Sequence, residues 1–504
     1  MSAGMESEGC THGHSDGVNN DYANGIEKGT CTHLLIVPMV LQAAAASAFR
    51  LAKKLSGRGV TVTLVMIKQN ADELHRMYSR EALQTLRISI EALDGYQPPS
   101  LPFPQLHSAS LKDAFRMFKE KLIANKKAGL PVPTCILADR WIPWIEDIAN
   151  VLDIPRYIFV SNAVTLSRVI QLYHEKEDEL KSLPNGPDWF QKSYELLRQQ
   201  PGLEFLKKAT DVPYATIDNG WFDYFRDIGR SFPGAHGIVF NSFYALEHQS
   251  VEAFRSAYPG SNKLKVPPVY LIGPLATAGE FNNVSFVAGL EDTHKECVEW
   301  LQAQPTKSVL FICLGGATRL FGEQITQLAR ALEASECRFL WALTKGRGNF
   351  ESVDEVLPPG YLERVRGRGK IVTGWVGQVE ILSNPAVGVF LSHCGWQSVL
   401  ESLTCGVPLL GWPQTGDQPL NCRWMQEALK VGMRVTEKEP GELVEQHEFE
   451  EAIKTLMSEK ERTVLAANAA KMMSMAAEAV AAGGPSDIAL DQLVESFSTF
   501  IRGN

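Results

Sequence analysis

The chain has 504 residues, of which 45% are hydrophobic and 21% charged, and its formal net charge is −9. This length predicts two domains of roughly 200–250 residues, and the composition is that of a globular protein rather than a disordered one. The acidic balance gives no reason to expect nucleic acid or an anionic membrane as a partner. Nine scattered cysteines without regular spacing indicate reduced thiols in a cytoplasmic protein.

The first 31 residues are expected to form a disordered tail, because they are mostly small and polar and contain no apolar stretch. Cys10, His12 and His14 lie close together in this tail, but two nearby histidines do not close a tetrahedral metal site. The most apolar region, 34–49, is interrupted by Pro38 and is too short to span a bilayer. We therefore expect no metal, no transmembrane segment and a monomer.

Short β-branched runs alternate with amphipathic segments along the first half of the chain. The predicted strands are 34–37, 60–65, 135–138, 157–160 and 237–241, with helices at 45–55 and 143–152. Residues 173–227 are less regular and rich in aromatic residues and prolines. This alternation predicts a parallel sheet that is covered on both faces.

A Pro-rich passage, 266–274, indicates a domain boundary, after which the same alternation restarts. The predicted strands are 309–314, 339–343, 370–373, 387–391 and 408–411, and the predicted helices are 324–334, 398–403, 421–429 and 449–502, the last broken near 483–485. We expect a first domain over 32–266, a second domain over 267–484, and a separate final helix over 485–504. Two facing Rossmann-like sheets would place a ligand cleft between their carboxyl edges.

The turn after the predicted strand 387–391 is the most informative feature. Backbone amides at the start of the following helix, together with the helix dipole, form an anion site without any lysine cluster. His393 can add a donor to a phosphate oxygen, and Gly395 allows the backbone to approach a ligand closely. Glu401 lies one helical turn beyond Gln397, so its carboxylate can accept hydrogen bonds from the vicinal hydroxyls of a ribose. Asp417 and Gln418 open the next helix and offer acceptors and donors for sugar hydroxyls.

Each of these features also has an ordinary structural explanation, since a strand, a turn with glycine and a helix occur in every α/β protein. The order and spacing of the whole stretch 375–418, WVGQVEILSNPAVGVFLSHCGWQSVLESLTCGVPLLGWPQTGDQ, are much more specific. Without insertion or deletion, this stretch resembles the 44-residue signature of plant secondary-product glycosyltransferases of family 1. The resemblance implies a GT-B fold with two Rossmann-like domains, a UDP-sugar donor and no further cofactor. It also implies that 32–266 binds the acceptor, that 267–484 binds the UDP-sugar, and that the final helix 485–504 returns to the first domain.

The resemblance also implies roles for the matched positions. Trp375 would stack on the uracil ring, and Val376 and Gln378 would contact the uracil edge and the ribose. His393, Gly395, Ser398 and the turn amides would hold the diphosphate, and Glu401 would bind the ribose hydroxyls. Trp396, Asp417 and Gln418 would contact the hexose, and a Gln at the end of the signature usually accompanies glucose donors.

Two positions near the diphosphate depart from the family pattern. The family's Asn after HCGW is Gln397 here, whose amide reaches one methylene further. Where the family has Phe-Gly-Ser, this chain reads Leu314-Gly315-Gly316, so Gly316 lacks the hydroxyl donor and Thr318 could substitute for it. We expect donor binding to survive these changes, somewhat weakened.

The largest departure concerns the general base. Residues 37–42 and 51–55 match the family at its usual spacing, but between them the chain reads Ala43-Ala44-Ala45-Ala46-Ser47, and the family's catalytic histidine corresponds to Ala44. Its carboxylate partner corresponds to Asp139, which would orient the imidazole. Losing a positioned base typically costs about 10²–10⁴ in rate.

Three outcomes of this substitution remain open. Asp139 could act directly or through a water molecule, the acceptor could need no base (an amine, a thiolate or a carboxylate), or the protein could bind UDP-sugar with little transfer, as a regulatory or binding pseudoenzyme. No GxGxxG motif follows a strand, which argues against a dinucleotide oxidoreductase.

The acceptor side is predicted less sharply. Ser161 follows a strand, where it could approach the sugar or cap a helix. Several aromatic residues could wall an apolar acceptor pocket or belong to the core; they are Trp141, Trp144, Trp189, Trp221, Phe222 and Tyr224. They favour an aromatic or terpenoid acceptor.

Overall fold

In the computed structural model, the first sheet contains seven parallel strands in the order β3-β2-β1-β4-β5-β6-β7. The model describes residues 32–99, 104–183, 187–213, 219–256, 266–276, 290–316, 322–343, 355–373 and 376–503. The strands of this sheet are β1 (His33–Val37), β2 (Thr61–Ile67), β3 (Ile88–Leu93), β4 (Cys135–Asp139), β5 (Arg156–Val160), β6 (Gly237–Phe240) and β7 (Val269–Leu271). The strand order changes direction at β1 and β4, which are paired in register from Leu34 opposite Cys135 to Val37 opposite Ala138.

Helices cover both faces of this sheet, as the buried strands require. They are α2 (Gln42–Ser56), α3 (Lys68–Met77), α4 (Arg80–Thr85), α5 (Pro104–Lys127), α6 (Ile145–Leu152), α7 (Val164–Glu175), α8 (Glu177–Lys181), α9 (Pro187–Leu197), α11 (Asn219–Ser231) and α12 (Tyr244–Arg255), with a short 3-10 turn, η1 (Ala209–Asp211). All five residues of β4 and of β5 are buried, so these strands form the centre of the sheet.

The second sheet has six parallel strands in the order β10-β9-β8-β11-β12-β13. Its strands are β8 (Val309–Cys313), β9 (Arg338–Ala342), β10 (Gly369–Val372), β11 (Val387–Ser392), β12 (Leu409–Gly411) and β13 (Gly432–Arg434). Its helices are α13 (Leu290–Gln302), α14 (Gly322–Ala334), α15 (Tyr361–Arg364), α16 (Gln378–Ser383), α17 (Trp396–Thr404), α18 (Gln418–Trp424), a π-helical turn η3 (Met425–Leu429), α19 (Gln446–Met457) and α20 (Glu459–Val480). The predicted two-sheet α/β architecture is confirmed.

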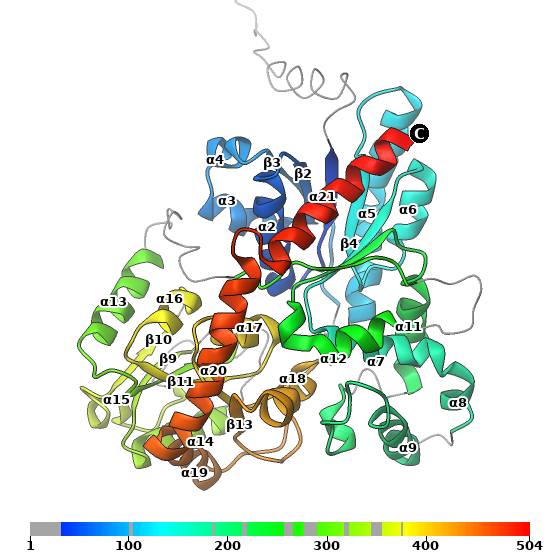
Figure 1. Cartoon of the computed structure of the whole chain (residues 1–504). Coiled ribbons are helices and arrows are strands. Elements are labelled where there is room, and N and C mark those ends of the chain that lie inside the picture. Colours follow the sequence, from blue (N-terminus) through cyan, green and yellow to red (C-terminus); the bar gives the residue numbers. More distant parts are fainter. Residues whose placement is uncertain are drawn as a thin grey trace, which may run out of the picture.

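The last helix, α21 (Pro485–Gly503), crosses from the second sheet back to the first, as the red ribbon of Figure 1 shows. Leu490, Leu493 and Phe497 pack into the hydrophobic core that also contains residues of β1 and β2. The Ser486 hydroxyl donates a hydrogen bond to the Gly273 carbonyl oxygen, and the Tyr157 hydroxyl donates to Ser496. The end of the chain therefore stabilises the domain in which the fold begins.

Three strands were not predicted from the sequence. β3 has mixed exposure at the edge of the sheet, and β13 has only three residues, so neither shows the continuous apolar run of a central strand. β7 lies in the Pro-rich passage and pairs with β6, so the first sheet extends beyond the predicted boundary at residue 266. The tail 1–31 is outside the described residues. No helix within the described ranges is long and apolar enough to cross a membrane.

Candidate active site

The two sheets direct the ends of their central strands toward each other. In the first sheet, the segment after β1 and the residue that ends β4, Asp139, emerge at the point where the strand order reverses. In the second sheet the equivalent neighbours are β8 and β11, which lead into Gly315 and His393. Such switch points are the places where open α/β sheets bind ligands.

The His393 ring fills a narrow space between two glycines. A Cβ atom at Gly315 would lie 2.9 Å from the ring, and one at Gly395 would lie 2.6 Å from its Nε2 atom. Gly315 also has a φ of 72°, and Cys394, between His393 and Gly395, has a φ of 62°. The sequence Cys394-Gly395 therefore makes a tight turn that places His393 at the start of α17.

Burial lowers the pKa of His393 to about 4, so its imidazole is neutral at physiological pH. A neutral imidazole donates from one ring nitrogen only, and Nδ1 has no hydrogen-bond partner within the part of the chain described here. His393 is thus suited to donate one hydrogen bond to a phosphate oxygen without adding a full positive charge.

Glu401 is held by three side chains. Its Oε2 accepts a hydrogen bond of 2.7 Å from the Gln378 amide, and its Oε1 accepts one of 3.1 Å from Gln397. The third partner is Arg50 of α2, whose Nη2 lies 3.4 Å from Oε1. The Gln378 amide also donates to the Ser398 hydroxyl at 3.1 Å. A ribose at this position would share or replace these partners.

Gln397 and Trp396 join the two domains. The Gln397 amide oxygen accepts hydrogen bonds from the Ser47 hydroxyl at 3.1 Å and from the Asn241 amide at 3.3 Å. The Trp396 indole N–H donates to the Asn241 carbonyl oxygen at 2.9 Å, and its side chain is only 2% exposed. The Trp396 indole is therefore part of the contact between the domains.

The predicted sugar-binding pair opens α18. Asp417 Oδ2 accepts hydrogen bonds from Asn421 at 3.1 Å and from Asn162 of the first domain at 2.9 Å. The Gln418 amide oxygen accepts from the backbone N–H groups of Gln414 and Thr415, which fixes the loop before the helix. Its amide N–H group is the part that remains to contact a ligand.

Asp139 is 3% exposed and accepts a hydrogen bond of 3.0 Å from the Trp141 backbone N–H. Burial raises the pKa of its carboxyl to about 6. The Trp141 N–H and the positive charge of Arg140 partly oppose this rise, and the Met39 N–H and the Ser161 hydroxyl oppose it to a smaller extent. The other oxygen, Oδ2, makes no hydrogen bond within the described residues. Ala44 is in the first turn of α2, which follows β1. Because β1 and β4 are neighbours in the sheet, Ala44 lies at the same carboxyl edge as Asp139, and it is 7% exposed.

The matched family model is described as UDP-glucoronosyl and UDP-glucosyl transferase, and it covers residues 279–474. UDP-glycosyltransferase 71B1 of Arabidopsis thaliana is 33% identical over 71% of this chain and 76% of its own length. UDP-glucosyl transferase 73M2 of Saponaria officinalis is 32% identical over 72% of this chain and 74% of its own length.

The chain belongs to the plant family 1 UDP-glycosyltransferases. It resembles the structure of Medicago truncatula UGT71G1 complexed with UDP-glucose, with a TM-score of 0.77, 25% identity and coverage of 94% of this chain and 100% of that one. It is similar also to a UDP-glucosyltransferase from Polygonum tinctorium capable of glucosylating indoxyl, with a TM-score of 0.77, 26% identity and coverage of 93% and 99%. The fold of this glycosyltransferase is therefore GT-B, and its donor is a UDP-sugar.

Several predicted site residues of the glycosyltransferase are buried in the core, packed on one another or outside the described residues. Val376 is buried in a core cluster of the second domain, as are Trp189 and Phe222 in the first. Trp141 stacks on Tyr224 with ring centroids 6.3 Å apart, and the Trp144 indole donates to Ser108. Trp375 and Thr318 lie outside the described residues, and so does the side chain of Trp221. Gly316 is exposed, and a Cβ there would lie 3.7 Å from the Gln42 amide oxygen.

Sequence reasoning missed four residues that the glycosyltransferase brings to this region. They are Arg50, Arg140, Asn162 and Asn241. Arg140 directly follows the predicted Asp139, so its position was a signal that could have been used. Arg50 is a single polar residue between apolar ones, Asn162 and Asn241 each lie beside a serine, and nothing in their spacing shows which residue of the opposite domain they meet.

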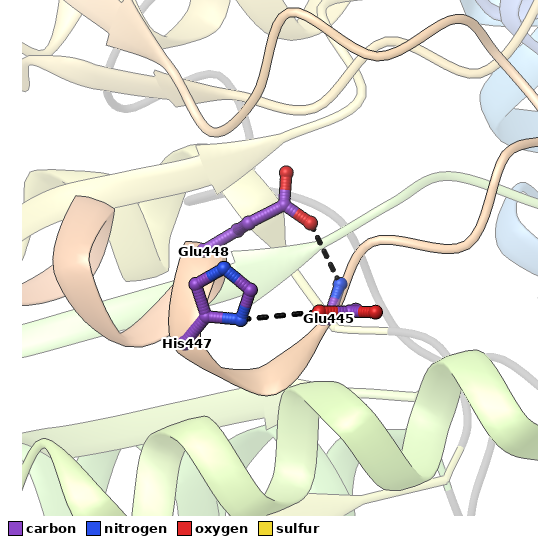
Figure 2. A group of neighbouring side chains, drawn as sticks. All are labelled: Glu445, His447 and Glu448. Atoms are coloured by element: carbon purple, nitrogen blue, oxygen red, sulfur yellow. Dashed lines mark hydrogen bonds and ion pairs between the residues drawn. The ribbon is translucent and has the colours of Figure 1, made fainter.

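One group in the described part of the glycosyltransferase has the residue types of a metal site, Glu445, His447 and Glu448 (Figure 2). The Glu445 and Glu448 carboxylates form the capping box of α19, and Glu448 also accepts from Lys438 and Thr436. These contacts account for the group without an ion, because the carboxylates satisfy the first backbone amides of the helix.

Proposed function

We propose that this glycosyltransferase moves glucose from UDP-glucose, with inversion, to a small aromatic or terpenoid acceptor, and that catalysis is weak or independent of a general base. The proposal rests on Ala44, which the resemblance assigns to the position of the base, and on Asp139, which ends β4 beside the strand that leads into the helix of Ala44. An inverting displacement passes through an oxocarbenium-like transition state, and the departing UDP is stabilised by helix amides rather than by the base.

The donor assignment is supported by the residues around α17 and α18. The α17 amides, His393, Gly395 and Ser398 would hold the diphosphate, and Glu401 would bind the ribose. Trp375, Val376 and Gln378 would contact the uridine, while Gly316 and Thr318 would border the diphosphate. Trp396, Asp417 and Gln418 would contact the hexose. UGT71G1, which is similar in structure, is complexed with UDP-glucose, and this supports glucose as the sugar.

The acceptor class is supported by the aromatic wall of Trp141 and Tyr224 near Asp139 and Ser161. The similar enzyme from Polygonum tinctorium glucosylates indoxyl, a small aromatic acceptor. A flat apolar molecule gains most by stacking on such rings. We further propose that the enzyme is cytoplasmic and monomeric.

The test compares the wild-type protein with Ala44→His, using UDP-glucose and a panel of phenols and alcohols. Release of UDP should be slow in the wild type and at least a hundredfold faster in the variant, because a general base contributes about 10²–10⁴ in rate. An unchanged rate in a variant that still binds UDP would contradict the proposed role of position 44. Heat stabilisation by UDP with no turnover by either protein on any acceptor would instead make the chain a binding protein.

A further inference from the structure

Arg140 is a buried cation with unused hydrogen-bond donors. It is 2% exposed, and its Nη1 donates a hydrogen bond of 2.7 Å to the Ser167 hydroxyl of α7. Its Nε and Nη2 atoms are buried and have no partner within the described residues. Every nitrogen of a guanidinium carries at least one N–H donor, so a large part of this group's bonding capacity is unsatisfied.

Arg140 lies at the carboxyl edge of the first sheet, within range of a charge on the second domain. It follows β4 directly, its backbone N–H donates to the Phe159 carbonyl oxygen at the end of β5, and its guanidinium lies 4.6 Å from the Trp141 ring centroid. The charges of Asp139 and of Asp417, from the second domain, are close enough to influence its pKa, although burial has the larger effect and lowers that pKa to about 10. Neither carboxylate forms an ion pair with it in the described part of the chain.

A buried arginine without a paired anion is unfavourable for folding, because its charge is removed from water and only partly compensated. A buried charged group with unsatisfied donors and a perturbed pKa is a candidate for a functional site. The planar guanidinium fork matches a carboxylate, which can accept two parallel hydrogen bonds from it. The two unsatisfied nitrogens of Arg140, Nε and Nη2, form one edge of such a fork.

We infer that Arg140 binds a carboxylate of a substrate in the cleft, and that this carboxylate belongs to the acceptor. The inference rests on the proposed function and narrows its acceptor to a carboxylic acid. An ionised carboxylate has no proton to lose when it attacks. One of its oxygens forms the bond to the anomeric carbon, the bond between that carbon and the UDP oxygen breaks, and the electron pair leaves with UDP. No base is required, which agrees with Ala44.

The alternative source of the carboxylate is the sugar of a UDP-glucuronate donor. Asp417, which is predicted to contact the donor hexose, is close enough to Arg140 to influence its pKa. The absence of a histidine at position 44 favours the acceptor, because a carboxylate on the donor would leave a hydroxyl acceptor without its base. The stacked rings of Trp141 and Tyr224 next to the guanidinium would cover the apolar part of an aromatic acid.

The experiment measures UDP release by the full chain with benzoic acid and benzyl alcohol as matched acceptors, each with UDP-glucose and with UDP-glucuronate. With UDP-glucose, the acid should show a kcat/KM at least tenfold above that of the alcohol. In Arg140→Gln this ratio should fall at least tenfold, mainly through KM for the acid, and Arg140→Lys should restore part of it.

The control is Arg156→Gln. Arg156 is also buried, but it lies at the amino end of β5, whereas Arg140 follows the carboxyl end of β4, and it contacts Ser231 and Glu146. Its acid-to-alcohol ratio should equal that of the wild type. If Arg140→Gln instead lowers the rate with UDP-glucuronate relative to UDP-glucose and leaves the acid-to-alcohol ratio unchanged, the bound carboxylate belongs to the donor. Equal losses on both acceptors and both donors, with stabilisation by UDP retained, would overturn the inference. Absence of UDP stabilisation in the wild type would contradict the proposed function itself.

Discussion

Arg50 on α2 and Glu401 on α17 form an ion pair between the two domains, with Arg50 Nη2 3.4 Å from Glu401 Oε1. Their side chains are only 11% and 7% exposed. Solvent therefore screens this pair only weakly. It lies where α2, the helix of Ala44, meets α17, the helix that begins at the predicted diphosphate site. It gives the donor site a cation that the family signature alone does not predict.

Replacing Arg50 with Gln should weaken UDP binding about tenfold, or about 1.4 kcal/mol. The reason is that Glu401 would keep its negative charge without its cation, close to an anionic ligand. Titration calorimetry with UDP measures the effect. Lys53→Gln is the matched control, since Lys53 lies on the same helix but contacts the Phe49 and Tyr78 rings. Tighter binding by the Arg50 variant would show that the ion pair obstructs the nucleotide.

Asp139→Asn should change how stability depends on pH. The pKa of Asp139 is raised by burial from 3.8 to about 6, so the folded protein holds an extra proton between these values. Stability that comes from this group is present at low pH and is lost as pH rises from about 4 to about 6. The variant should lack this loss, which is on the order of 1–3 kcal/mol.

Calorimetric unfolding of both proteins at pH 4.5 and pH 7 tests this prediction, because the difference between them removes the contributions of other groups. Asp72→Asn, on a surface with 52% side-chain exposure, should behave as the wild type. The same change of Tm with pH in the wild type and in Asp139→Asn would contradict the burial effect.

Asp211→Asn should lower the free energy of unfolding by about 3 kcal/mol, because it removes the buried anion that Arg423 and Arg434 share, although Arg423 keeps Glu437 at 2.6 Å. Asp211 is fully buried, and its Oδ1 lies 2.9 Å from Arg423 Nε and 3.0 Å from Arg434 Nη1. It joins the segment after α9 to the second domain. Denaturant unfolding is the measurement, and Asp223→Asn at a surface ion pair should cost less than about 1 kcal/mol. Equal effects of the two substitutions would show that the buried network contributes little.

The sequence was sufficient to predict the central strands, because short, mostly apolar runs such as those of β4 and β11 are buried on both faces. It also predicted the tight turn at Gly395, where any side chain would collide with His393. The edge strand β3 was missed, because exposure on one face removes the continuous apolar run.

Contacts between the domains were beyond sequence reasoning. Trp396 is an aromatic residue of the type that stacks on ligands, yet its indole N–H donates to the Asn241 carbonyl oxygen in the opposite domain. Likewise nothing in the pattern of α2 shows that Arg50 meets Glu401. Such pairs depend on the relative placement of two sheets, which periodicity within either domain does not determine.

The central claim is that the turn at His393 and the carboxylate of Glu401 bind the nucleotide. Titration of UDP into the wild type and into Glu401→Gln tests it most directly, with Glu299→Gln as a surface control at 62% side-chain exposure. We predict that the wild type and the control bind UDP equally, and that Kd rises at least about tenfold in Glu401→Gln, since hydrogen bonds to a charged group contribute about 1.5–3 kcal/mol. Equal UDP affinity in all three proteins, or no binding by the wild type, would contradict the claim.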